Sequence, residues 1–474
     1  MLAGAPPALA APAAVPELTA ALDSAVSRAQ TSLQAGDLPA AQVHYRQALF
    51  EGWMLMATLE RVAGRLTEAV KALDEAQAAV EGDAQATFLL GAEYLWLKQP
   101  AAAERLFAKA LADRPMAALH VLIGRAYRDA GEYERARTHL HAALRQDPRV
   151  RHAHYYLGMV ALVEGAGPQG LATAIAEMRE ELALDPQDPL ANDQLGVALL
   201  DSGRAAEAIA PLETAARTDP RFLSISHLGR GLLAVDRPRE AVVALRRALE
   251  LATAQGAGAG DLRKIHYQLG LALRKLGDAP GAAEQLAQAR QASADDGAEG
   301  ATAGSAAGEA STGAGASPLA ALPADARVAV REHVKAELAR TYLNLGVIEA
   351  QGERFAGAAQ RFEKAAALDP DFPQVQSSLG IAYFNARQFD QAAGPLARAV
   401  AISPEAGGLS RMLAMAWLNT EEYAKAAELL QSDPEREKDP ALQFAYGMPL
   451  VKSDRPAEAE QVFAQLVRAH GDSA

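Results

Sequence analysis

The sequence predicts an all-α fold, a solenoid built from antiparallel helix–turn–helix repeats. Three features of its 474 residues predict this fold. An aliphatic residue followed by glycine recurs along the chain, a ladder of alanines around a larger apolar residue follows each pair, and proline closes many of the units. Recurrence at a fixed period of 20 to 50 residues is the signature of a repeat architecture.

The aliphatic–glycine pairs set the period. Successive glycines are separated by 33, 34, 38, 33, 41, 76 and 34 residues. Glycine inside a helix costs about 1 kcal/mol relative to alanine, so we expect the backbones of neighbouring helices to touch at these points. The pairs are Leu90-Gly91, Ile123-Gly124, Leu157-Gly158, Leu195-Gly196, Leu228-Gly229, Leu269-Gly270, Leu345-Gly346 and Leu379-Gly380.

The second half of each unit is an alanine ladder. Alanine stands twelve residues after each glycine, except after Gly158, where the gap is 16, and a larger apolar residue and another alanine usually follow it. Both halves of a unit have apolar residues at helical spacing. Closing prolines, such as Pro220 and Pro370, predict the end of the second helix because proline cannot continue it. One such ladder is Ala208, Leu212 and Ala215.

This pattern resembles the tetratricopeptide repeat, a helix–turn–helix unit of about 34 residues. Two weaker copies lie near the start, one with Tyr45 and Ala48 and one with Trp53 and Gly64, and others near the end bring the total to about twelve. The resemblance implies a right-handed superhelix whose concave face is lined by the first helix of each repeat. The best matches are Leu90, Gly91, Tyr94, Ala103, Phe107, Ala110 and Pro115, and Leu379-Gly380 with Tyr383 through Pro404.

The chain is expected to divide into four segments. Residues 17–293 form an array of about eight repeats, and residues 327–471 form one of about four. Between them, residues 294–326 form an Ala/Gly/Ser-rich linker with no Lys, Arg or aromatic residue. Such a composition predicts disorder, and both a passive linker and a hinge remain open.

The first segment, residues 1–16, is rich in Ala and Pro. It is expected to be either a disordered tail or the remnant of a secretory signal that lacks the positively charged start. Both an exported, periplasmic protein and a cytoplasmic one fit the sequence. No apolar run of 18 residues is present, so no transmembrane segment is expected.

Composition and motifs argue against an enzyme. The net charge of −13 disfavours nucleic acid, and the absence of cysteine excludes disulfides and thiolate chemistry. No phosphate-binding loop, nucleophile elbow or zinc-protease motif is present. The close pairs His139/His141 and His152/His154 point to different helix faces. We therefore expect no catalytic residue, no metal and no cofactor.

The resemblance places a ligand on the concave face. With the aliphatic–glycine pair at positions 7 and 8 of the repeat, positions 2, 5, 9 and 12 are expected to be exposed there. They form a mildly basic surface with aromatic residues, suited to an acidic or C-terminal peptide, although helix surfaces commonly carry arginine. The candidate binding residues are Arg125, Arg128, His152, Tyr155, Arg230, Lys264, Tyr267 and Arg274.

The resemblance therefore implies a protein-binding scaffold. If the chain is exported, bacterial members that support secretion, pilus or polysaccharide assembly are the nearest analogues. The alternative is a regulatory or sensor subunit of a separately encoded enzyme. A carbohydrate-modifying role would need a catalytic domain, and the repeats leave no room for one. A homo-oligomer is compatible with the sequence.

Overall fold

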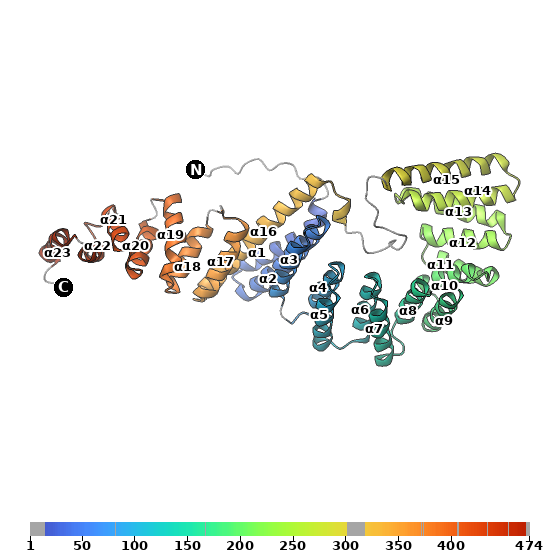
Figure 1. Ribbon diagram of the computed structural model, residues 1–474, viewed down its shortest axis with the longest axis horizontal. Coiled ribbons are helices and arrows are strands. Elements are labelled where there is room, and N and C mark those ends of the chain that lie inside the picture. The colour runs from blue at the N-terminus through green and yellow to red at the C-terminus, as the bar shows by residue number, and fades with distance from the viewer. Residues whose placement is uncertain are drawn as a thin grey trace. The chain divides into compact units, whose positions relative to one another are not determined.

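A computed structural model describes residues 15–80, 82–165, 167–300, 318–370, 372, 374–404, 407–433, 435–453 and 455–470. Within these ranges it has 23 α-helices, one short 3₁₀ helix and no strand (Figure 1). Most helices pair as antiparallel hairpins, so the predicted all-α solenoid is confirmed. The chain divides into two compact units, unit 1 with residues 1–81 and 317–474, and unit 2 with residues 82–316.

Unit 2 is an uninterrupted run of six hairpins. In each hairpin the first helix packs on the second, and in the first five hairpins the second helix also packs on the first helix of the next repeat. Its helices are α4 (Ala84–Trp96), α5 (Pro100–Asp113), α6 (Ala117–Asp129), α7 (Tyr133–Gln146), α8 (Ala153–Glu164), α9 (Pro168–Leu184), α10 (Pro189–Asp201), α11 (Ala205–Thr218), α12 (Phe222–Ala234), α13 (Pro238–Ala254), α14 (Ala259–Lys275) and α15 (Ala279–Gly300).

Unit 1 joins the first three helices of the chain to all those that follow unit 2. Its elements are α1 (Val15–Gln34), α2 (Leu38–Val62), α3 (Leu66–Ala79), η1 (Pro318–Ala321), α16 (Ala324–Gln351), α17 (Phe355–Leu368), α18 (Val375–Asn385), α19 (Phe389–Ile402), α20 (Gly407–Asn419), α21 (Tyr423–Gln431), α22 (Pro440–Lys452) and α23 (Pro456–His470).

The recurring glycines lie where the two helices of a hairpin are closest. A Cβ atom built on Gly124 would lie 2.6 Å from Cγ of Leu140, and one on Gly380 would lie 2.7 Å from Cγ of Leu396. The expected close approach is therefore present. The contact differs in kind from the expected backbone-to-backbone one, because the glycine mainly receives the large side chain in the middle of the alanine ladder.

In most hairpins, the turn has one described residue with a positive φ, which is the left-handed side of backbone conformation. Glycine takes this place at Gly131 and Gly203, with φ of 81° and 78°. Other repeats put a residue with a side chain there, although L-amino acids pay a steric penalty for this conformation. These residues are Lys98, Asp236, Glu353, Arg387 and Glu421, with φ between 57° and 64°.

Helix α2 differs from the sequence prediction. The two weak copies expected around Ala48 and Trp53 are separated by no turn, because one helix runs from Leu38 to Val62. It packs on α1 with one side of its surface and on α3 with another. Gly52 lets it also approach α16, since a Cβ atom there would lie 2.7 Å from Cδ2 of Leu338.

Polar contacts tie these N-terminal helices to α16, which lies along α1 and α2 (Figure 1). Arg331 donates to Glu60 at 2.8 Å, and Nε2 of His333 lies 2.9 Å from a carboxylate oxygen of Asp23. From the sequence, residues 17–81 are assigned to the start of the 17–293 array. In the structure, these residues belong to the same compact unit as the helices from α16 onward.

Two predicted segments fall partly outside the described residues. Within the N-terminal segment of residues 1–16, residues 1–14 are not described, and α1 begins at Val15. Within the predicted 294–326 linker, residues 301–317 are not described, and helix occupies both flanks, because α15 continues to Gly300 and α16 begins at Ala324. No helix in the described ranges has the length and apolarity needed to cross a membrane.

Candidate functional site

Position 5 of the repeat, two residues before the aliphatic–glycine pair, is an interface position in unit 2. Four consecutive repeats have side chains there that are only 5% to 8% exposed, namely Val121, Tyr155, Asp193 and Ser226. Each contacts the first helix of the next repeat: Asp193 accepts from His227 at 2.9 Å, and Ser226 lies 3.4 Å from Gln268. In these four repeats position 5 therefore joins consecutive repeats and does not line an open groove.

Tyr155 was expected to be exposed on the concave face, and this expectation is wrong. Its ring packs with Met178 of α9 and with Ala191 and Leu195 of α10. Burial raises the pKa of its hydroxyl to about 12. The sequence pattern places Tyr155 on the first helix correctly, but it does not reveal that the next first helix covers this position.

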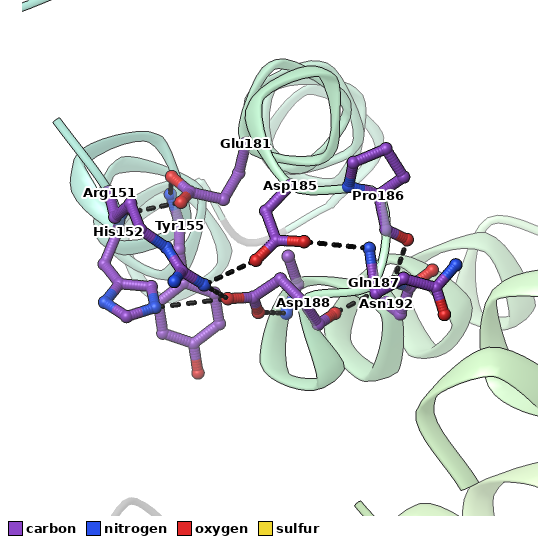
Figure 2. Close-up of polar contacts among 10 residues, drawn as sticks. Arg151, His152, Tyr155, Glu181, Asp185, Pro186, Gln187, Asp188 and Asn192 are labelled. Atoms are coloured by element: carbon purple, nitrogen blue, oxygen red, sulfur yellow. Dashed lines mark hydrogen bonds and ion pairs between the residues drawn. The ribbon is translucent and has the colours of Figure 1, made fainter. Parts of the chain in front are cut away.

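His152 lies in the turn before α8 and belongs to a polar network between three helices (Figure 2). Its backbone is in the left-handed region, with φ of 66°. The imidazole Nε2 lies 3.1 Å from Oδ2 of Asp188. The neighbouring Arg151 donates to Asp185 at 2.6 Å and to Asp188 at 3.3 Å. The imidazole of His152 thus already has a hydrogen-bonding partner within the protein.

Two buried carboxylates complete the network by capping helices. Glu181 of α9 is completely buried and accepts the backbone N–H groups of His152 at 2.6 Å and of Tyr155 at 3.2 Å, at the start of α8. Asp188 caps α10 by accepting the N–H of Ala191 at 2.9 Å. Both satisfy donors that a helix N-terminus leaves unpaired.

The charges of this network shift its pKa values in opposite directions. The hydrogen bond to Asp188 raises the pKa of His152, and this outweighs the effect of burial. For Asp188, burial acts to raise the pKa, but hydrogen bonds from His152 and from the Ala191 N–H, together with the charges of His152 and Arg151, bring it below its ordinary value.

His152, Glu181 and Asp188 are also the residues that could offer ligand atoms to a metal, since one atom of each lies within 4.8 Å of the others. Each of these atoms already has a partner: the carboxylates hold backbone N–H groups, and Asp188 also faces Arg151. The neighbouring His154 has a different partner, Glu177, at 2.7 Å. The arrangement is that of a helix-capping network.

Three arginines of the predicted site stand on first helices beside acids at position 13. Arg125 lies 3.6 Å from Asp129, and Arg128 pairs with the same carboxylate while its guanidinium lies 4.9 Å from the ring centre of Tyr156. Arg230 pairs with Asp201 of the preceding repeat. These arginines are only partly exposed, and their charge is partly neutralised.

The remaining predicted residues lie on α14. Lys264 is exposed, 3.8 Å from Asp261, and Arg274 is exposed near the C-terminal end of the helix. Tyr267 is 52% exposed, unlike the other position-5 residues of unit 2. The eight predicted residues therefore do not form one site: they belong to first-helix surfaces, a buried interface and the end of unit 2.

Sequence reasoning missed the residues that hold the His152 network, namely Arg151, Glu181 and Asp188. One signal was present. In the repeat with the 16-residue gap, the last alanine of the ladder is replaced by Glu181, and a carboxylate at a position buried in every other repeat requires a partner.

Comparison with known families supports the repeat assignment. The family model described as "Tetratricopeptide repeat" matches residues 121–189, in unit 2, and residues 377–440, in unit 1. No curated protein matches the chain.

Solved structures of MamA proteins are similar to a portion of the chain. The structure titled "MamA RS-1 ArsTM double mutant" is 20% identical, covering 38% of this chain and 97% of its own, with a TM-score of 0.33. The one titled "MamA 41-end from Desulfovibrio magneticus RS-1" is also 20% identical, covering 38% of this chain and 96% of its own, with a TM-score of 0.33.

Proposed function

Because this chain is a tetratricopeptide repeat protein, we propose that it is a non-enzymatic scaffold that binds a peptide or a partner protein through the first helices of unit 2. The observation that carries the proposal is a row of four arginines at positions 9 and 12, which we call the concave row: Arg125, Arg128, Arg230 and Arg274. Arginine is enriched among residues that dominate interface energetics.

Charge supports an acidic partner for the concave row. The row stands in a chain of net charge −13, so it is a local departure from the overall charge. Asp129 and Asp201 pair with three of its members, and an acidic peptide would compete with them. Such binding should weaken as salt rises, because exposed charges are screened over about 8 Å at physiological ionic strength.

Charge reversal tests this function. The triple variant Arg125→Glu, Arg128→Glu and Arg230→Glu should lose the proteins that the parent captures in a pull-down read by mass spectrometry. A matched control reverses three arginines on second helices, Arg217, Arg239 and Arg247, and should capture them like the parent. Both should keep the helicity of the parent by circular dichroism. Unchanged capture by the first variant would contradict the concave row as the binding surface.

Co-purification and fractionation separate the two settings that the family resemblance implies. A scaffold of envelope, secretion or polysaccharide assembly would co-purify with envelope proteins and would be found outside the cytoplasm. A regulatory or sensor subunit would instead bring down a separately encoded enzyme in stoichiometric amount.

A further inference from the structure

A hollow of about 570 Å³ opens at the end of unit 2, between α14 and α15. Its apolar side comes from Leu286 and Ala289 on α15, and Tyr267 stands beside them on α14. Three cations complete the lining, namely Arg263, Lys264 and Arg290. The hollow therefore combines an apolar surface with a positively charged margin.

In earlier repeats of unit 2, the corresponding groove holds the first helix of the next repeat. Three apolar clusters contain these contacts. Tyr155 and Met178 pack on Ala191 and Leu195 of α10. The other two are Val121, Leu140 and Ala143 against Ala153 and Leu157 of α8, and Ile225 and Ala248 against Ile265 of α14.

The last groove has no such occupant within unit 2, where no described helix follows α15. Tyr267 at position 5 is 52% exposed, whereas four of its five counterparts are 5% to 8% exposed and the fifth, Phe88, is half-buried. Leu286 is only half-buried, whereas Leu140, Leu212 and Leu245 at the same place in other repeats are fully buried. The hollow therefore corresponds to the groove in which one more helix would pack.

The surface around the hollow, which we call the end surface, has the same kinds of residue as the α8 repeat. Arg263, Lys264 and Tyr267 take positions 1, 2 and 5, which Arg151, His152 and Tyr155 occupy in the α8 repeat. His266 lies 2.8 Å from Gln285, as His154 lies 2.7 Å from Glu177. Only these two of the six repeats in unit 2 have cations at positions 1 and 2 and a tyrosine at position 5.

The α8 repeat shows what such cations contact. Arg151 and His152 face Asp185 and Asp188, the residues that lead into α10 (Figure 2). At the end surface, Asp261 is 3.8 Å from Lys264. Among the described side chains, neither Arg263 nor Arg290 pairs with a carboxylate. Among the side chains that the structure describes at the end of unit 2, Asp261 alone approaches one of these cations, and no acid takes the place of Asp185 and Asp188.

We propose that the end of unit 2 binds one amphipathic helix of a partner protein, with aspartate or glutamate at its N-terminal cap. The contacts of α10 give its pattern: an acid at the cap, as Asp188, an aliphatic residue three positions later, as Ala191, and another four positions further, as Leu195. The acid meets Arg263 and Lys264, and the aliphatic residues cover Tyr267 and Leu286. None of the residues that line the hollow belongs to the concave row, although Arg274 of that row stands on the same helix, α14.

The probe for this proposal is a fluorescein-labelled peptide with the sequence of residues 185–201, held helical by a staple on the face away from α8 and α9. Its binding to the full-length chain is measured by fluorescence anisotropy. The parent should bind the peptide, and the variants Tyr267→Ala and Arg263→Glu should each bind it at least tenfold more weakly. The exposed Arg239→Glu variant is the matched control and should bind like the parent.

A second peptide tests the charge. Lysine in place of both acids, Asp185→Lys and Asp188→Lys, should weaken binding to the parent at least tenfold. Absence of binding by the first peptide, or equal binding by Tyr267→Ala, would overturn the proposal. Analytical ultracentrifugation gives a further test. If the parent chain self-associates and the Tyr267→Ala variant is a monomer, the occupant of the hollow is a second copy of this chain, and the proposal is overturned.

Discussion

The indole Nε1 of Trp53 donates a hydrogen bond to the hydroxyl of Tyr342 at 3.0 Å, across 289 positions of the chain. The same hydroxyl donates to Glu75 at 3.0 Å, and Lys364 pairs with that carboxylate. These four residues join α2, α16, α3 and α17 through one buried tyrosine, whose pKa is raised by burial and by Glu75. The contact fixes the N-terminal helices on the rest of unit 1.

Tyr342→Phe should destabilise unit 1 by about 1–3 kcal/mol, since it removes two partly buried hydrogen bonds and leaves the Trp53 N–H without its acceptor. The expected readout is a lower midpoint in thermal unfolding followed by circular dichroism. Tyr267→Phe, at an exposed hydroxyl, should leave the midpoint unchanged. Equal midpoints for the parent and Tyr342→Phe would contradict the proposed role of this contact.

Gly124→Leu should cost about 1–3 kcal/mol through overpacking, because its Cβ would lie 2.6 Å from Leu140 and 3.2 Å from the carbonyl oxygen of Ala136. Gly158→Leu should cost less, since the opposing atom is the flexible terminal methyl of Met178, at 2.8 Å. Urea unfolding measures the difference.

Gly394 provides the matched control for these glycines. It is helical, but a Cβ there would meet no atom within 4 Å. Gly394→Ala should therefore stabilise the protein by up to about 1 kcal/mol. A loss of stability at Gly394, or no loss at Gly124, would show that the helices do not pack as described.

The His152–Asp188 pair should make stability depend on pH on both sides of neutrality. The pKa of His152 is raised, so its contribution is complete below the ordinary value near 6.5 and is lost as pH rises through the raised value. The pKa of Asp188 is lowered, so its contribution is present above 3.8 and is lost as pH falls through the lowered value. His152→Gln should reduce the alkaline loss in unfolding experiments run upward from about pH 6.5, and His154, whose pKa is raised by its hydrogen bond to Glu177, should account for part of the remaining loss.

His139→Gln is the control, because the pKa of His139 is shifted in the opposite direction from that of His152. His139 and His120 lie 3.1 Å apart between α6 and α7, and burial lowers both pKa values. Since the unfolded chain takes up protons first, this pair loses stability as pH falls through about 6.5. His139→Gln should reduce that acid loss and leave the alkaline side unchanged. The same profile for both variants would contradict the assignment.

Arg387→Gly should stabilise unit 1. Arg387 has φ of 58° in the turn between α18 and α19. Relief of the left-handed strain outweighs the greater freedom of glycine in the unfolded chain, for a net gain of about 0.5–1 kcal/mol. The reverse change, Gly131→Ala, should lose a similar amount, since no atom lies within 4 Å to add a clash. Thermal midpoints of both variants check the pair.

The sequence predicts the repeats well because their signal is local. Gly124 and Leu140 lie in one hairpin, so their spacing alone places them face to face. The unbroken helix α2 was not predicted, because Ala48 and Trp53 fit either two repeats or one long helix. The docking of α1 to α3 on α16 was not predicted either, since Gly52 and Leu338 are far apart in sequence and no periodicity links them.

The candidate site was harder to predict for a related reason. A helical pattern gives the face on which Tyr155 and Tyr267 stand, and they share position 5. What separates them is the presence of a following helix, α10 after Tyr155 and none within the described residues of unit 2 after Tyr267. Exposure in a solenoid depends on the neighbouring repeat, so one repeat's sequence cannot determine it.

The division of unit 1 affects how the protein folds during synthesis. α1 to α3 leave the ribosome before α16, the helix on which they dock, and α16 follows about 250 residues later, after roughly 10–50 s at ordinary elongation rates. Unit 2 can complete its own hairpins in that interval, because its contacts are between neighbours in sequence. During that interval α16 cannot cover the apolar surface of α2 around Gly52, so this surface stays open to solvent until α16 is made.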